Sequence, residues 1–315
     1  MSEVKKIATR ESYAAALVEY AKDHEELVVL DADLAGATKT GVFKKAYPDR
    51  FFNCGIAEQN MMGVAAGLAA CGKTVCASSF SMFASGRAFE NIRNSIGYTK
   101  LNVKIGATHA GVSVGEDGAT HQCNEDIALM RTIPNMTIIN PCDDVEAKML
   151  VKQALDRKGP VYMRFGRLAI PVFNDENTYT CEIGKGKLMK DGNDVTIVAT
   201  GLMVYEALGA AKALELEGIN ARVINIHTIK PIDKDILVKA AKETGLLVTV
   251  EEHSIIGGLG SAVTEVLSEE YPTKVVRIGM NDEFGVSGPA VELLKKYGLS
   301  ADNIAKVTKE AFNNK

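Results

Sequence analysis

Glu58 stands where a short predicted strand, ending at Gly55, gives way to an apolar helix rich in Ala, Met and Leu. Burying a carboxylate there without a cation is costly, and no Lys or Arg follows it until Lys73. A buried acid of this kind is suited to exchanging a proton with a ligand nitrogen. The alternative is a helix-start acid that simply favours the positive end of the helix dipole.

The segment from Gly106 to Gln122 is the second candidate, because it is long, contains four glycines and has little regular pattern. It holds His109 and His121, two of only five histidines, and the acid Asp117. Long loops inside a compact domain are usually functional. Two imidazoles and a carboxylate suit a polyhydroxylated substrate or proton transfer. The alternative is a Gly-rich surface loop with solvated histidines.

Two pairs of side chains lie near the ends of other predicted strands. Phe80 and Phe83 are three residues apart at a strand-to-helix junction, where they could stack on a flat heteroaromatic ring or simply belong to the core. Arg164 and Arg167 follow the last strand of the first half. Their guanidinium donors suit a phosphate or carboxylate, and a salt-bridged strand end is the alternative.

Several familiar motifs are incomplete or absent. Gly257, Gly258 and Gly260 follow a predicted strand and open a helix, but they lack the full GxGxxG spacing, so we interpret them as a tight turn. The sequence has no GxxxxGK[ST] phosphate loop and no GxSxG elbow, which argues against a P-loop enzyme and an α/β-hydrolase. Its six cysteines form no CxxC pair, so we predict reduced thiols and no metal ligand set.

Strand-like and helical runs alternate along nearly the whole chain. Continuous apolar strands between helices predict doubly wound α/β domains, each a mostly parallel sheet covered on both faces. We predict domains at 1–172 and 194–315, joined by a polar, Gly- and Lys-rich linker at 173–193. Ligands of such sheets bind beyond the carboxyl ends of the strands. The predicted strands are 27–33, 50–55, 73–79, 102–108, 136–140, 160–165, 194–200, 220–226, 246–251 and 274–278. The predicted helices are 10–23, 41–47, 58–70, 83–96, 124–131, 143–157, 203–217, 233–244, 258–269, 289–297 and 300–312.

Length and charge restrict the class of protein. A chain of 315 residues fits two domains better than one. Its net charge of −4 and pI near 5.8 disfavour nucleic acid as the main partner. The sequence shows no membrane-spanning run and no signal peptide, so we expect a cytoplasmic protein.

Taken together, these motifs resemble the transketolase family of thiamine diphosphate enzymes, over essentially the whole chain. In that family, the Glu of a G-I-x-E-x-x-M string bonds the N1′ nitrogen of the cofactor's aminopyrimidine, and here the string contains Ile56 and Glu58. The resemblance implies that both residues bind the cofactor and that Glu58 is catalytic. The family's aromatic pocket for the same ring corresponds to Phe80 and Phe83.

The loop is similar to the family string T-H-D-S-I-G-x-G-E-D-G-P-T-H-Q. Ala110, Val112 and Ala119 replace its Asp, Ile and Pro. The match implies that three loop residues contact the sugar and that two of them are catalytic, and that one of two arginines binds the substrate phosphate. The implied sugar contacts are His109, Asp117 and His121, the implied catalytic histidines are His109 and His121, and the arginines are Arg164 and Arg167.

The resemblance covers only the latter part of a typical family member. The G-D-G … N motif that anchors Mg²⁺ and diphosphate in the family is absent, since Glu116-Asp117 belongs to the substrate loop. The implied protein is the C-terminal subunit of a split transketolase, which transfers a two-carbon ketol unit between sugar phosphates. A separate N-terminal subunit would hold the metal and the diphosphate, and a heterotetramer is expected by analogy.

Three alternatives stay open at this point. One is the β subunit of a 2-oxoacid dehydrogenase, which shares both domains and the cofactor glutamate. Another is the latter part of a 1-deoxyxylulose-5-phosphate synthase. The third is a non-catalytic nucleotide-binding or scaffolding protein, for which the Gly257–Gly260 turn is the support. The Gly-Glu-Asp-Gly-Ala-Thr-His-Gln run favours the ketol-transferring branch.

Overall fold

Six strands of the first half and one strand of the second half form one seven-stranded sheet in the computed structural model, which describes residues 5–315. The strand order is β12-β6-β7-β5-β4-β2-β3, and every neighbouring pair is parallel except β12 with β6. The strands are β2 (Leu27–Asp31), β3 (Phe51–Asn53), β4 (Thr74–Phe80), β5 (Val103–Thr108), β6 (Thr137–Ile139), β7 (Val161–Arg164) and β12 (Thr228–Lys230).

Helices cover both faces of this sheet. Neighbouring strand residues such as Val28 and Val29 point to opposite faces and therefore belong to different hydrophobic cores. One core is closed by α1 (Thr9–Tyr20), α3 (Gly41–Ala46) and α7 (Asp144–Asp156), and the other by α4 (Glu58–Ala70) and α6 (Asp126–Arg131). A short α2 (Ala35–Thr38) follows β2. The helix predicted at 83–96 is instead α5 (Phe89–Asn91) between the wider π-helical turns Phe83–Arg87 and Ile92–Tyr98.

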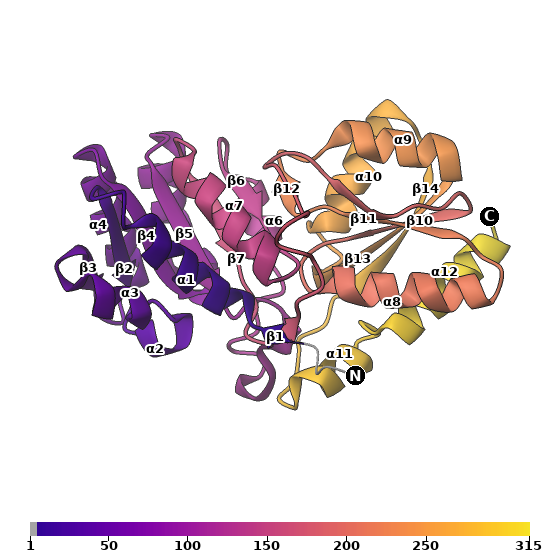
Figure 1. Ribbon diagram of the computed structural model, residues 1–315, viewed down its shortest axis with the longest axis horizontal. Helices are drawn as coiled ribbons and strands as arrows, with labels where there is room; N and C mark the ends of the chain where they lie inside the picture. Colours follow the sequence, from indigo (N-terminus) through magenta and orange to yellow (C-terminus); the bar gives the residue numbers. More distant parts are fainter. Residues whose placement is uncertain (1–4) are drawn as a thin grey trace.

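The second lobe repeats the design with a five-stranded sheet in the order β14-β13-β10-β11-β9 (Figure 1). Its strands are β9 (Lys187–Lys190), β10 (Val195–Ala199), β11 (Ala221–Asn225), β13 (Leu246–Ser254) and β14 (Lys274–Met280). One face is covered by α8 (Met203–Leu216), α11 (Ala290–Lys296) and α12 (Ala301–Asn313), and the other by α9 (Lys234–Thr244) and α10 (Leu259–Glu270). The two sheets confirm the predicted fold class.

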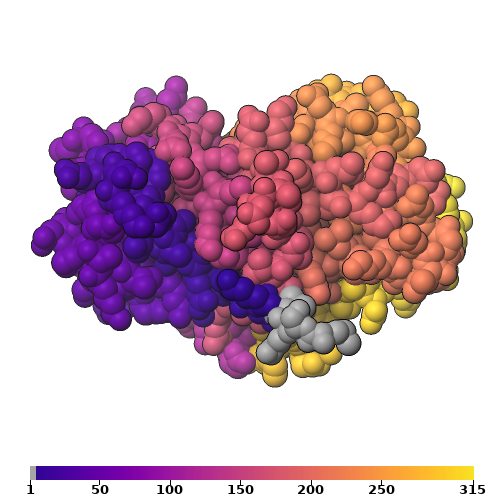
Figure 2. Space-filling model, in the orientation of Figure 1, coloured from indigo at the N-terminus to yellow at the C-terminus, as the bar shows by residue number. Residues whose placement is uncertain are grey.

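The lobes are joined by more than a linker and pack directly against each other (Figure 2). β12, which lies within the range predicted for the second domain, pairs antiparallel with β6 at the edge of the first sheet. β9 lies in the predicted linker but pairs antiparallel with β11. A small antiparallel pair, β1 (Lys6–Ile7) with β8 (Ile170–Pro171), closes the first lobe. Of the helices in residues 5–315, none combines the length and apolar character needed to cross a membrane.

Candidate active site

The predicted site residues gather at the carboxyl edge of the first sheet. Phe80 ends β4 and is in register with Thr108 at the end of β5, while Arg164 ends β7 in register with Ala107. β3 runs directly towards the turn that opens α4 at Glu58. Parallel strands bring all of these ends to one side, where open α/β sheets bind ligands.

Glu58 is the first residue of α4, and its side chain is buried, with 3% of it exposed. The Nη1 atom of Arg87 lies 3.4 Å from both carboxylate oxygens, and the Arg87 side chain is 53% exposed. The expectation of a glutamate without a nearby cation is therefore wrong, because the chain turns back and brings Arg87 to it. Both residues line an open pocket of about 530 Å³, together with the strongly exposed Ile56.

An aromatic cluster adjoins this pocket. The rings of Phe80 and Phe83 stack with centroids 5.8 Å apart, and Phe80 also stacks on His109 at 3.8 Å. His121 meets the edge of Phe83 at 5.4 Å, and the guanidinium carbon of Arg87 lies over that ring at 4.2 Å. The π-helical turn at Phe83–Arg87 presents both of its end residues to the site, a use typical of π-bulges.

Arg87 provides a direct test of whether a thiamine ring fits these residues. Its planar, nitrogen-bearing head group lies against Phe83 and bonds Glu58 at the same time. A flat heteroaromatic ring needs the same two contacts, a π-face for stacking and a carboxyl group that can share a proton with a ring nitrogen. The residues present therefore fit the aminopyrimidine end of the cofactor.

His109 is held neutral by its surroundings. Burial, followed by the positive charges of Arg10 and Arg167, lowers the pKa of His109 to about 3. The Nη1 of Arg10 lies 3.1 Å from Nε2, and Thr108 Oγ1 lies 2.9 Å from Nδ1. Because a guanidinium only donates, Nε2 accepts and Nδ1 carries the proton. The backbone of His109 is left-handed, with φ 56°, which is a common mark of a constrained site.

The remaining loop residues lie nearer the surface. Asp117 is exposed and lies 3.8 Å from the Nη1 atom of Arg167, whose side chain is 34% exposed. The same nitrogen approaches Glu116 at 3.2 Å and donates to the carbonyl of Val114. His121 is half-buried, and its Nδ1 lies 2.9 Å from Thr120 Oγ1. Arg167 therefore faces the loop with part of its head group still accessible.

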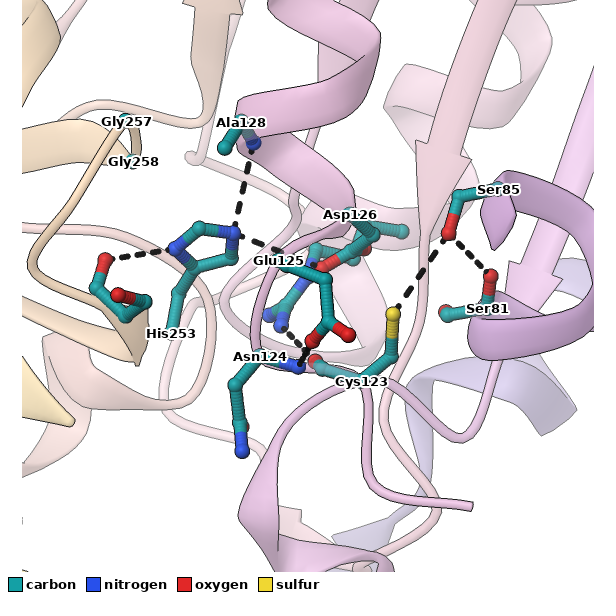
Figure 3. Close-up of polar contacts among 12 residues, drawn as sticks. Ser81, Ser85, Cys123, Asn124, Glu125, Asp126, Ala128, His253, Gly257 and Gly258 are labelled. Carbon is teal, nitrogen blue, oxygen red and sulfur yellow. Dashed lines mark hydrogen bonds and ion pairs between the residues drawn. The ribbon is translucent and has the colours of Figure 1, made fainter. Parts of the chain in front are cut away.

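Arg164 has a different environment, because it is buried between the two lobes. Its Nε donates to both carboxylate oxygens of Asp126, at 2.9 and 3.2 Å, and its Nη2 donates to the carbonyl of Glu252 at 2.9 Å. The buried His253 lies 3.9 Å from the same carboxylate and accepts a bond from Ala128 N (Figure 3). Burial lowers the pKa of His253 to about 4. This cluster connects the lobes behind the pocket.

The backbone amides at the Gly257–Gly260 turn are hydrogen-bonded to a carboxyl group of the same lobe. The buried carboxylate of Glu251 accepts hydrogen bonds from Leu259 N at 2.6 Å and Gly260 N at 2.8 Å, at the start of α10. A Cβ atom on Gly258 would approach that carboxylate to 2.0 Å. The phosphate of a dinucleotide would need the same amide groups, so the interpretation as a tight turn agrees with the contacts.

A second polar cluster, Glu146 with Cys181 and His227, has ligand-type atoms within 4.8 Å of one another. The carboxylate of Glu146 already accepts bonds from Tyr179 Oη, Asn225 Nδ2 at 2.8 Å and Cys142 N at 2.7 Å. We therefore assign this cluster to structure, because it attaches the predicted linker to both lobes.

Two site residues escaped the sequence analysis. Arg10 reaches His109 across 99 residues of chain, and Arg87 reaches Glu58 across 29. Arg10 lies in the first helix, with no motif around it. Arg87 is four residues after Phe83, so the helical spacing between the aromatic pair and an arginine was the one available signal.

Comparison with known proteins identifies the family. Residues 5–172 match the transketolase pyrimidine binding domain, and residues 184–304 match the transketolase C-terminal domain. A Methanocaldococcus jannaschii protein provisionally named a transketolase C-terminal section is 56% identical over 299 residues, which cover 94% of each chain. A 6-deoxy-6-sulfo-D-fructose transketolase subunit from Clostridium sp. (strain MSTE9) is 42% identical over 97% of this chain and 95% of its own.

A solved structure described as a split gene transketolase, inactive β4 tetramer, has a TM-score of 0.91 and 55% identity, covering 98% of this chain and 99% of that one. The chain therefore belongs to the transketolase family of transferases, as the C-terminal subunit of a split, two-subunit enzyme. This confirms the resemblance predicted from the motif strings.

Proposed function

We propose that this subunit supplies the ring-binding half of a thiamine diphosphate site, and that the completed enzyme transfers a two-carbon ketol unit from a ketose phosphate to an aldose phosphate. The observation that carries the proposal is the buried carboxylate of Glu58 beside the Phe83 face, with one planar cationic group already contacting both. Ile56 and Phe80 complete the wall of this half-site.

Thiamine diphosphate, when bound, supplies the carbanion chemistry that a protein side chain lacks. Glu58 would hold or share a proton at the ring nitrogen, at an atom screened from water on the protein side. Phe80 and Phe83 would orient the ring by stacking. The diphosphate and Mg²⁺ are assigned to a separate N-terminal subunit, because G-D-G … N is absent from this chain.

The sugar phosphate is assigned to the cationic side of the loop. Arg10 and Arg167 both act on the pKa of His109, so these positive groups face the same small region. Arg167 is accessible, whereas the donors of Arg164 are engaged with Asp126 and backbone carbonyls. We therefore propose Arg167 as the phosphate ligand and Arg164 as a structural residue. His109, His121 and Asp117 would contact sugar hydroxyls and stabilise developing charge.

The assembly is proposed as a heterotetramer, with two copies of this subunit and two of the N-terminal subunit. The relative described as an inactive β4 tetramer supports the need for a second subunit. The relative that acts on a sulfo-sugar shows that family members of this size differ in substrate, so the pentose phosphates are a proposal for this chain.

The test is reconstitution with a co-expressed N-terminal subunit carrying G-D-G … N. Xylulose 5-phosphate with ribose 5-phosphate should react, and pyruvate should not. Glu58→Gln should lower turnover by at least about 100-fold, the usual loss for an acid–base group, with an unchanged circular dichroism spectrum. Glu19→Gln, at an exposed residue of α1 that pairs with Lys22, is the matched control. Wild-type turnover in the Glu58 variant would refute the role of Glu58, and turnover of pyruvate would refute the reaction class.

A further inference from the structure

The loop from His109 to Gln122 belongs to the first lobe, but the second lobe holds its inner side. Val112 is fully buried in the same core as Met280 and Leu293 of the second lobe. The side chain of Gln122 donates to the carbonyl of Val286 at 3.0 Å and to the loop's own Val112 carbonyl at 3.2 Å. The loop is therefore held from two directions: first-lobe residues such as Phe80 contact His109, and the second lobe contacts Val112 and Gln122.

Glu252 makes the closest polar contact of this kind. It lies on β13, and its carboxylate accepts the backbone N–H of Ser113 at 2.5 Å, across 139 residues of chain. Arg164 donates to the backbone carbonyl of Glu252 and not to its carboxylate. The carboxyl group of Glu252 is therefore directed at the loop, and burial raises its pKa to about 7.

The loop backbone is shaped to receive this carboxylate. Gly111 has a φ of +79°, and a Cβ atom there would lie 2.3 Å from the carboxyl carbon of Glu252. Any other residue would both strain the backbone and displace the glutamate. Two positions away, His109 stacks on Phe80, so a shift of the loop at Gly111 moves a ring of the site.

The neighbouring residue provides an internal comparison. Glu251 is also buried on β13, but successive strand residues point to opposite sides, and Glu251 binds the amides of Leu259 and Gly260 in its own lobe. The two adjacent glutamates are alike in burial and in making short bonds to backbone amides. They differ in that only Glu252 reaches the loop of the other lobe.

We propose that Glu252 is a positioning residue of the active site, which fixes the substrate loop from the second lobe through the Ser113 amide. The second lobe thereby influences substrate binding without contacting the substrate, because it fixes the positions of His109, Asp117 and His121. The relevance to sugar binding rests on the proposed function, whereas the mechanical claim, that Glu252 orders the loop, does not.

The first test is amide hydrogen exchange on the full chain alone, without partner or cofactor. In Glu252→Ala, amides 111–118 should exchange about 10-fold faster or more, because the short buried hydrogen bond from Ser113 N to Glu252 is lost. Glu251→Ala, the matched control, should speed exchange at the start of α10 and leave the loop as in the wild type. Unchanged exchange of amides 111–118 in Glu252→Ala, or equal loop exchange in the two variants, overturns the proposal.

A conservative variant covers the case in which the alanine variant does not fold. Glu252→Gln keeps the shape and an acceptor oxygen but not the charge, so the loop should exchange at a rate between the wild type and Glu252→Ala. If only the glutamine variant folds, wild-type exchange of the Ser113 amide in it overturns the proposal.

The second test uses the reconstituted enzyme and separates positioning from general damage. Glu252→Ala should raise the KM for the sugar phosphate by about 10-fold, while the affinity for thiamine diphosphate, measured by titration, should change less than the KM because Glu58 lies on another segment. Glu252→Gln should restore most of the KM. If amide exchange in the loop responds as expected but the reconstituted enzyme shows no ketol transfer, only the proposed function is refuted. An unchanged KM in Glu252→Ala would refute the positioning role.

Discussion

Replacing Arg164 by Met should lower the free energy of unfolding by about 3 to 5 kcal/mol, the usual loss when one partner of a buried ion pair is removed. The structure explains the size of the effect. Arg164 donates to both oxygens of Asp126 and to the carbonyls of Glu252 and Cys123, and both members of the pair are buried. Met fills a similar volume but leaves Asp126 with the hydroxyl of Tyr162 as its remaining close donor, at 2.9 Å.

The assay is urea unfolding followed by far-UV circular dichroism, at one protein concentration because assembly adds to stability. Tryptophan fluorescence is not an option, since the chain has no Trp. Adding Asp126→Asn to the Arg164 variant should recover part of the loss, because the uncompensated charge is removed. Arg167→Met is the matched control: its charged partners, Glu116 and Asp117, are exposed, so stability should fall by less than about 1 kcal/mol while sugar phosphate binding weakens. A loss below about 1 kcal/mol in Arg164→Met would refute the assignment of Arg164 to structure.

Two further predictions concern the pocket. Arg87→Met should raise the affinity of the reconstituted enzyme for thiamine diphosphate, because Arg87 occupies both the Phe83 face and the Glu58 carboxylate; a weaker affinity in a calorimetric titration would mean that Arg87 helps to hold the ring. The His109 ring should stay neutral from pH 5 to 8, because its pKa is lowered to about 3. The unfolded state then binds more protons than the folded one between about pH 3 and the unperturbed value near 6.5, so His109 makes stability rise with pH across that window. Histidine-selective NMR checks this, and a His109 titration midpoint near 6.5 would contradict it.

Much of the fold followed from local patterns. Short apolar runs such as 27–31 and 246–251 are typical of strands buried on both faces, and their alternation with helices favours a parallel sheet. β12 and β9 escaped prediction because each is an antiparallel edge strand of three or four residues. A strand this short is defined by its partner rather than by its own sequence.

Candidate chemistry was also readable from the sequence. Glu58, His109 and His121 could be named without coordinates, because the strings around them resemble those of a known family and each side chain suits proton transfer. Arg164 and Arg167 could not be told apart, because both lie at the same end of β7. Burial separates them: Arg164 is enclosed between the lobes, and Arg167 is partly accessible.

The sequence by itself determined most strands of the two sheets, the edge at which we propose that ligands bind and most of the side chains gathered there, since these depend on periodicity and on residues close together in the chain. Only the tertiary structure decided which cations and anchors face those side chains. Arg87 at Glu58, Arg10 at His109 and Glu252 at Ser113 are contacts across 29, 99 and 139 residues. Such contacts depend on how the helices and the two lobes pack. Local sequence patterns do not specify this packing, because it joins residues that are far apart in the chain.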